Sequence, residues 1–113
     1  MNSMVPRSAD LAVQIVRFVY EHQPGIVACE LIDSDGRSHT FIDKIPMFSV
    51  DRLDRDSQYP QPGLARCTIV REWRDADGRE LVNISTSEPD HLESTEGLTG
   101  FVVLRDQVSV APQ

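Results

Sequence analysis

The chain has 113 residues and carries 18 acidic against 11 basic side chains, which gives a formal net charge of −7. This length suits one domain, and a 40% share of apolar residues is usual for a globular protein. The negative balance argues against a protein that binds nucleic-acid phosphates or an anionic membrane surface. We therefore expect neither nucleic acid nor a membrane as a partner.

Targeting signals and cysteines bear on the compartment. The first residues show no apolar segment behind a basic start, and no apolar run approaches the ~20 residues of a membrane-spanning helix. Two cysteines, Cys29 and Cys67, are too few for a disulfide framework. These features predict a cytoplasmic protein in which both thiols are free and buried.

The residue composition favours strands. Val and Ile together number 19, whereas Leu and Ala together number 14, and β-branched side chains fit a pleated sheet better than a helix. Turn signals separate short β-type runs along the chain. The pattern predicts a single all-β domain over residues 11–110, a small barrel or sandwich of six to eight mostly antiparallel strands. Residues 1–10 are expected to be a flexible N-terminus and 111–113 a short tail.

The first strand is expected within residues 11–20. Its apolar spacing also fits a helical stripe, but four β-branched residues favour the strand. Residues 51–63 alternate in charge and end in two prolines and a glycine, which indicates a long surface connection. Residues 87–100 are polar and are interpreted as a loop. A last buried strand is expected over 101–104, with 108–110 as its extension.

Two hairpins are predicted, because an Asp-Gly pair between β-type runs is the strongest short-range hairpin signal. The pairs are Asp35-Gly36 and Asp77-Gly78. In the first hairpin, alternation places Val27, Cys29 and Leu31 on the core face. Both turns read Asp-x-Asp-Gly-Arg, and a Pro-Gly pair precedes the cysteine of each hairpin by the same spacing. Shared turn chemistry explains this similarity between the two hairpins, and an internal duplication is the alternative explanation.

Possible metal ligands are scattered. The soft ligands are His22, His39, His91, Cys29 and Cys67. No two of them lie at the spacing of about two to four residues that zinc motifs show. The two Asp-x-Asp-Gly segments resemble the start of a calcium loop, but Lys44 and Thr86 occupy the position where that loop requires Glu. We expect no metal and no cofactor.

One polar loop carries groups that are used in hydrolysis. Residues 90–96 contain His91, Glu93 and Glu96 beside hydroxyl side chains. Proximity in sequence argues only weakly for catalysis, because triads assemble from distant positions, and neither a nucleophile elbow nor a P-loop is present. We assign no catalytic residue. Tyr59, His91, Glu93 and Glu96 are retained as a candidate binding site, roofed by the connection around Tyr59.

Ten of the 11 basic residues are Arg, and four of these lie between residues 66 and 79, around Trp73. Interleaved Arg and aromatic side chains can bind single-stranded nucleic acid. Acidic residues interrupt this set, so cross-strand ion pairs are the favoured role. The Arg bias itself fits either a GC-rich genome or a need for bidentate pairing with carboxylates or phosphates.

Four strings together resemble a group of small uncharacterised bacterial proteins. They are Glu21-His22-Gln23-Pro24-Gly25-Ile26-Val27-Ala28-Cys29-Glu30-Leu31, Lys44-Ile45-Pro46, Tyr59-Pro60-Gln61-Pro62-Gly63 and Glu93-Ser94-Thr95-Glu96-Gly97-Leu98. The resemblance covers about residues 12–110. It implies a bacterial, cytosolic origin and brings over no catalytic residue.

These observations predict a non-enzymatic protein-interaction module that binds a protein partner or self-associates. An immunity-type inhibitor of a basic toxin is one version, because acidic surfaces speed the capture of basic partners. Pairing of edge strands across a two-fold axis, which would give a homodimer, is another. The alternative is a small-molecule or hydrolytic site near His91, Glu93 and Glu96. Residues 85–96 hold four acids and no Lys or Arg, which makes this loop the surface of interest.

Overall fold

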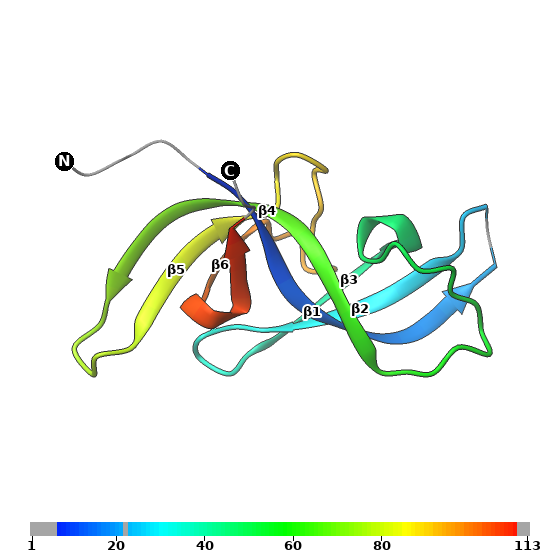
Figure 1. Cartoon of the computed structure of the whole chain (residues 1–113), viewed down its shortest axis with the longest axis horizontal. Coiled ribbons are helices and arrows are strands. Elements are labelled where there is room, and N and C mark those ends of the chain that lie inside the picture. Colours follow the sequence, from blue (N-terminus) through cyan, green and yellow to red (C-terminus); the bar gives the residue numbers. More distant parts are fainter. Residues whose placement is uncertain (1–6, 22, 111–113) are drawn as a thin grey trace.

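The computed structural model describes residues 7–21 and 23–110, which form one seven-stranded antiparallel sheet curled into a half-barrel (Figure 1). The strands are β1 (Arg7–Tyr20), β2 (Ile26–Ile32), β3 (Ser38–Lys44), β4 (Gln61–Arg74), β5 (Glu80–Ser85), β6 (Gly100–Leu104) and β7 (Val108–Val110). The helical elements in this part of the chain are two 3-10 turns, η1 (Ile45–Met47) and η2 (Arg105–Gln107). No helix in these ranges is long and apolar enough to cross a bilayer. The predicted all-β fold of six to eight strands is confirmed.

β1 organises the sheet. The strand order is β3-β2-β1-β4-β5-β6, and β7 pairs with β1. One edge of β1 pairs with β4, while the other pairs first with β7 and then with β2. The ladder between β1 and β2 shifts register after Ile15 and again after Phe18. Such bulges strengthen the twist of a strand, which curls the sheet at this point.

The prediction of a strand over residues 11–20 is confirmed, but the prediction that residues 7–10 lie outside the folded domain is wrong. β1 begins at Arg7, and Ser8 and Ala9 pair with Thr68 and Cys67 of β4. Ala9 is buried, so this segment belongs to the core ladder. Residues 1–6 and 111–113 and the candidate ligand His22 lie outside the described residues.

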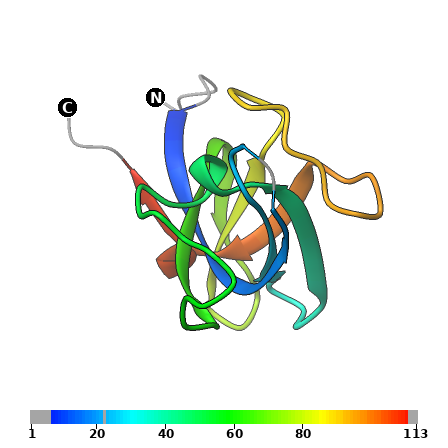
Figure 2. The same cartoon turned by 90° about the vertical axis from the view of Figure 1, so that its right-hand side faces the viewer.

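The core fills the inside of the curl, which Figure 2 shows end on. Alternate residues of the central strands face it, and the predicted inward set Val27, Cys29 and Leu31 is buried. Phe41 of β3 and Phe101 of β6 meet edge to face, with ring centroids 5.6 Å apart. This contact matters because β3 and β6, the first and last strands of the six-strand order, are not hydrogen-bonded to each other.

Each Asp-Gly segment forms the turn of a hairpin, the first between β2 and β3 and the second between β4 and β5. The two turns have the same construction: Asp33 and Asp75 each accept hydrogen bonds from the backbone N–H groups two and four residues ahead. Gly36 and Gly78 have φ of 81° and 84°, a region that glycine enters without a steric penalty. Turn chemistry therefore accounts for the Asp and the Gly of the repeated pattern.

The connection predicted over residues 51–63 is shorter than expected, and residues 108–110 form a separate strand that pairs with β1. β4 begins at Gln61, so residues 61–63 belong to the strand. Gly63 packs inside: a Cβ there would lie 2.9 Å from Ile15 Cγ1 and 3.1 Å from the Phe48 carbonyl oxygen. Residues 108–110 do not extend β6. The turn η2 separates them from it, and as β7 they pair with β1.

The connection of residues 86–99, called here the β5–β6 loop, bridges the gap between β3 and β6. Its Thr95 N–H donates to the Thr40 carbonyl of β3 over 2.7 Å. Ser34 N–H, in the β2–β3 turn, donates to the Val102 carbonyl of β6 over 2.9 Å. The half-barrel is thus closed by loop contacts and side chains in place of a strand ladder.

Candidate functional site

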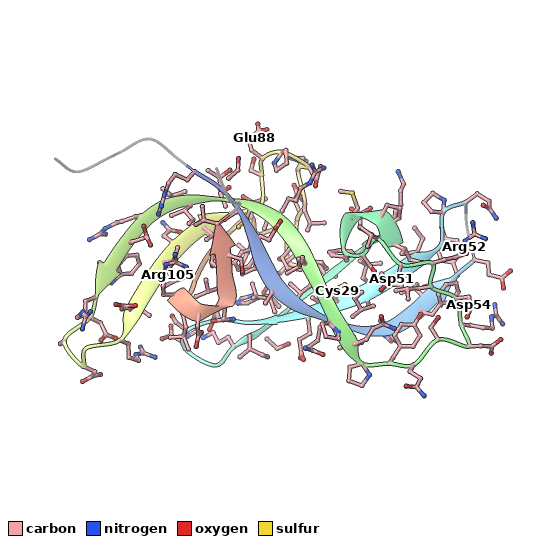
Figure 3. The ribbon with its side chains drawn as sticks, in the orientation of Figure 1. Cys29, Asp51, Arg52, Asp54, Glu88 and Arg105 are labelled. Atoms are coloured by element: carbon pink, nitrogen blue, oxygen red, sulfur yellow. The ribbon has the colours of Figure 1, made fainter. Side chains whose placement is uncertain are left out.

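A groove of about 600 Å³ lies at one end of the half-barrel, between the end of β1, the β1–β2 connection, η1 and residues 50–54. Its lining residues are Phe18, Glu21, Gln23, Pro24, Gly25, Ile45, Pro46, Val50, Asp51, Arg52, Leu53 and Asp54. Figure 3 shows Asp51, Arg52 and Asp54 together at the right-hand end of the molecule. We call this feature the end groove.

The floor of the end groove is apolar and continuous with the core. Ile45 is buried, and Phe18 and Leu53 pack against the core cluster. Gly25 allows the floor to close: a Cβ there would lie 3.0 Å from Phe18 Cε1 and 3.0 Å from Ile45 Cδ1. The Ile45 N–H also donates to the Gly25 carbonyl over 2.9 Å. These contacts hold the floor in place without any bound partner.

Val50 stands on the edge of this floor and is fully exposed. An isolated exposed valine is ordinary, but this one borders an apolar surface that already lies open. A partner that covered the groove would bury Val50 together with Phe18 and Leu53. The apolar lining therefore offers a contact surface that the chain itself leaves uncovered.

The rim of the end groove is negative. Glu21, Asp51 and Asp54 line it, against one guanidinium, Arg52. Arg55 approaches Glu21 at 3.3 Å, but both side chains are more than half exposed, and such a pair is weak. The rim thus keeps an excess of carboxylate.

The lining carries few groups for covalent chemistry. Among its described residues there is no Ser, Thr, Cys, His, Lys or Tyr. Nucleophilic catalysis by a hydroxyl, thiol, imidazole or amine therefore has no candidate among these residues, and the carboxylates are the groups left for acid–base chemistry. The groove therefore offers apolar contact and negative charge as its two means of recognition.

Tyr59, the predicted roof, is placed elsewhere. Its hydroxyl donates to the Asp54 carbonyl over 2.6 Å, its ring packs against the core, and burial raises its pKa. Its connection (green) and the β5–β6 loop (yellow to orange) occupy different parts of the molecule in Figures 1 and 2. The structure therefore does not bring Tyr59 over the loop. The tyrosine braces the connection that supplies the groove rim.

The other three predicted site residues divide between two contacts. His91 has a positive φ of 51°, and its Nε2 lies 3.5 Å from Glu93 Oε1, with both side chains well exposed. Glu96 faces a different histidine, His39, at 2.5 Å. The three do not converge on one point, so the geometry does not assemble the proposed hydrolytic site.

The acidic loop is largely compensated. Asp90 receives a bidentate pair from Arg66, with distances of 2.6 and 3.0 Å. Glu88, which projects away from the body in Figure 3, is the loop carboxylate for which the described residues show no ion pair. The loop is therefore less negative in effect than its sequence indicates.

Three of the four clustered Arg side chains form ion pairs, and one of these pairs, Arg74 with Glu80, is of the expected cross-strand kind. Arg74 pairs with Glu80 across β4 and β5, and Arg79 pairs with Asp75, each at 2.9 Å. Arg71 instead lies over the Trp73 ring, 4.7 Å from its centroid. Three of the four clustered guanidinium groups thus have a carboxylate partner.

Sequence reasoning missed one cluster, at His39. Its side chain is 9% exposed, with Nδ1 2.5 Å from Glu96 Oε1 and Nε2 2.8 Å from Asp33 Oδ2. Burial by itself lowers the pKa of His39, but the hydrogen bonds and charges of the two carboxylates outweigh it and raise the pKa above its usual value. The sequence signal that could have indicated this cluster is the spacing of His39 and Phe41, which lie two residues apart and therefore on the same, inward face of a strand.

The same contacts act on Asp33. Burial raises the pKa of this carboxyl, but hydrogen bonds from His39 and from the Arg37 and Asp35 backbone outweigh burial and lower it. Each of the two groups thus favours the charged form of the other. Phe101 covers the histidine from β6, with ring centroids 4.9 Å apart.

Metal ligands do not gather in the described ranges: no group of three or more His, Cys, Asp or Glu is placed to hold an ion. At His39 the imidazole lies between the carboxylates, so the three do not converge. Cys29 and Cys67 are free and buried. Burial raises the pKa of each thiol to about 12, and Asp10 adds to the effect at Cys67.

The fold and the groove thus define a small all-β half-barrel with an apolar, acid-rimmed recess at one end. Comparisons with family models, with curated proteins and with solved structures found no significant match to the chain.

Proposed function

We propose that this chain is a non-enzymatic protein-binding module and that the end groove is its recognition surface. The observation that carries the proposal is the combination, in one recess, of an apolar floor with a rim of three carboxylates and one guanidinium. Apolar contact supplies affinity, and charge at a rim supplies orientation and speed of encounter.

The occupant that fits is a basic segment of another protein that carries an apolar anchor. The anchor would cover Phe18, Leu53 and Val50, while Lys or Arg side chains beside it would meet Glu21 and Asp51. A second copy of the chain fits less well, because it brings a charge of −7 to a surface that is already negative. An acidic inhibitor of a basic protein is therefore favoured over a homodimer.

A cytoplasmic, bacterial setting is part of the proposal. It is supported by the resemblance to small bacterial proteins and by two buried thiols that remain unpaired. The proposal predicts partners that are themselves basic and share that compartment.

The test uses three capped nonapeptides as probes. One has a central Leu-Phe pair flanked by Arg, the second replaces Arg by Glu, and the third replaces Leu-Phe by Ala-Ala. Amide chemical shifts of the isotope-labelled protein report where each peptide binds. We expect saturable shifts at Gly25, Val50 and Leu53 with the first peptide only, weakened by added salt.

A matched pair of variants tests the charge. Asp51→Asn removes a rim carboxylate, and Glu88→Gln removes an exposed carboxylate far from the groove. Asp51→Asn should weaken the Arg peptide, and Glu88→Gln should not. Equal binding of the Arg and Glu peptides, or shifts away from the groove, would contradict the proposal. Groove shifts that depend on protein concentration without peptide would instead identify a second copy as the occupant.

A further inference from the structure

We propose that the contact of Glu96 with His39 is a proton-operated clasp, which holds the tip of the β5–β6 loop against β3 and opens when His39 loses its proton. The clasp is independent of the end groove, which lies at another part of the molecule. It is a conformational device built from residues that no step of the proposed binding uses.

The chemical basis is the number of N–H groups on the ring. Only the imidazolium has a proton on both nitrogens. Each nitrogen of His39 faces a carboxylate oxygen, Nδ1 toward Glu96 at 2.5 Å and Nε2 toward Asp33 at 2.8 Å. A neutral ring has one N–H, so one carboxylate would then face a lone pair.

When His39 loses its proton, its contact with Glu96 breaks and its contact with Asp33 remains. Asp33 is fixed, because its Oδ1 accepts the backbone N–H groups of Asp35 and Arg37 at 2.9 and 3.0 Å. Its side chain is 14% exposed, whereas that of Glu96 is 48% exposed. The described residues provide Glu96 with no hydrogen bond besides the one to His39. Water can therefore replace the histidine at Glu96 far more easily than at Asp33.

The part that moves is short. Residues 94–98 form their own turn, in which Ser94 N–H donates to the Leu98 carbonyl and Gly97 N–H to the Ser94 carbonyl. Leu92 and Ser94 are buried, and the Thr86 hydroxyl donates to the Leu92 carbonyl over 2.5 Å. The base of the loop is thus anchored, and the tip from Thr95 to Leu98 is free to lift.

Lifting the tip uncovers a strand edge. The Thr95 N–H is bonded to the Thr40 carbonyl, which points away from β2 at the outer edge of β3. Without this bond, the carbonyl is open to solvent or to another strand. Proton loss at His39 would therefore expose backbone that the closed loop covers.

No other charged group among the described residues contacts the ring. Leu31 lies opposite it on β2, Phe101 covers it from β6, and the charges that act on it are those of Asp33 and Glu96. These two raise the pKa of His39, so the clasp is closed at low pH and opens as the pH rises through that raised value.

The experiment follows His39 and Thr95 in the same sample by nuclear magnetic resonance, from about pH 5 to about pH 9. The ring nitrogen shifts report the proton on His39, and amide exchange reports protection of the Thr95 N–H. Linkage requires Thr95 protection to fall about tenfold for each unit by which the clasp raises the histidine pKa. Leu92 N–H, bonded to the Thr86 carbonyl, is the internal reference and should keep its protection.

Two variants make the test specific. In Glu96→Gln the amide can accept from a ring N–H or donate to a bare ring nitrogen, so Thr95 protection should no longer depend on pH. Glu93→Gln, in the same loop but paired with exposed His91, should retain the wild-type transition. Constant Thr95 protection through the titration of His39, or a Glu96→Gln variant that behaves as wild type, would overturn the proposal.

Discussion

Asp33 and Asp75 occupy the same position in two turns of the same construction, but their second carboxylate oxygens bind different partners. Asp33 Oδ2 accepts from His39 Nε2 at 2.8 Å, and Asp75 Oδ2 accepts from Arg79 Nε at 2.9 Å. Arg79 also links the two turns, because its Nη1 donates to the Ser34 carbonyl over 3.0 Å. The repeated sequence thus yields one common turn and two distinct attachments.

This pair gives a matched substitution experiment. Asp33→Asn keeps the turn acceptor but removes the charge that faces a buried imidazolium, so it should destabilise the protein by about 1–3 kcal/mol near pH 6. Asp75→Asn removes the partner of an exposed Arg, so it should destabilise the protein much less. Urea unfolding of both variants measures the difference. Equal losses would mean that the contact with His39 adds nothing to the turn.

The stability of the wild-type protein should fall both at acidic and at alkaline pH. The pKa of His39 is raised in the folded state, so its stabilisation is complete below the unfolded pKa and is lost as pH rises through the folded value. The pKa of Asp33 is lowered, so its contribution is lost as pH falls through its folded value. Urea midpoints across pH should give a maximum in the weakly acidic range. A Glu96→Gln variant should flatten the alkaline side, and an unchanged slope there would contradict the assignment.

Gly63 should not tolerate a methyl group. A Cβ there would lie 2.9 Å from Ile15 Cγ1 and 3.1 Å from a backbone oxygen, so Gly63→Ala should cost about 1–3 kcal/mol through overpacking. Gly100→Ala is the control, since a Cβ at Gly100 meets nothing within 4 Å. Thermal unfolding compares them. A Gly63→Ala protein as stable as the Gly100→Ala protein would show that the strand moves aside without strain.

Both thiols should be inert in the folded protein. Burial raises the pKa of Cys29 and of Cys67 to about 12, so the reactive thiolate is scarce at neutral pH. A chromogenic disulfide reagent should modify both cysteines in denaturant and neither at a measurable rate in buffer. Rapid modification of either thiol under native conditions would contradict the buried placement.

Val50 should matter for binding and little for stability. Val50→Ser removes an exposed apolar contact from the end groove, so it should weaken the Arg-flanked peptide several-fold while leaving the unfolding free energy within about 0.5 kcal/mol. Val70→Ser is the control, because Val70 is partly exposed on β4 and does not line the groove. A Val70→Ser variant that weakens the peptide equally would locate the binding elsewhere.

Much of the fold follows from local pattern. Alternation predicted the inward residues of β2, and the Asp-Gly pairs coincide with the turns of two hairpins. The start of β1 was missed, because Arg7 to Asp10 has little strand character and is held by its partner β4. The placement of β7 was missed for the same reason: three residues carry no signal for which distant edge they will join.

The candidate site was harder to predict than the fold. The sequence drew attention to Glu93, Glu96 and His91 because they are neighbours, yet Glu96 binds His39 from a strand far back in the chain. The end groove unites Phe18, Gly25, Ile45 and Leu53, which no spacing rule connects. Local chemistry identifies turns well, whereas a surface made by four separate segments becomes visible only when they are assembled.

The central position of β1 has a consequence for how the chain reaches this state. The antiparallel pairs β1–β2, β2–β3 and β4–β5 can form from neighbouring residues, but β1 also pairs with β4, between Arg7 and Ile69 at one end and between Ile15 and Gln61 at the other. Closing so long a loop is slow, and it must precede the burial of Leu11, Val13 and Ile15. The quickly formed local pairs would thus wait for the slow ladder between β1 and β4, and during that interval an apolar edge stays available to the wrong neighbour.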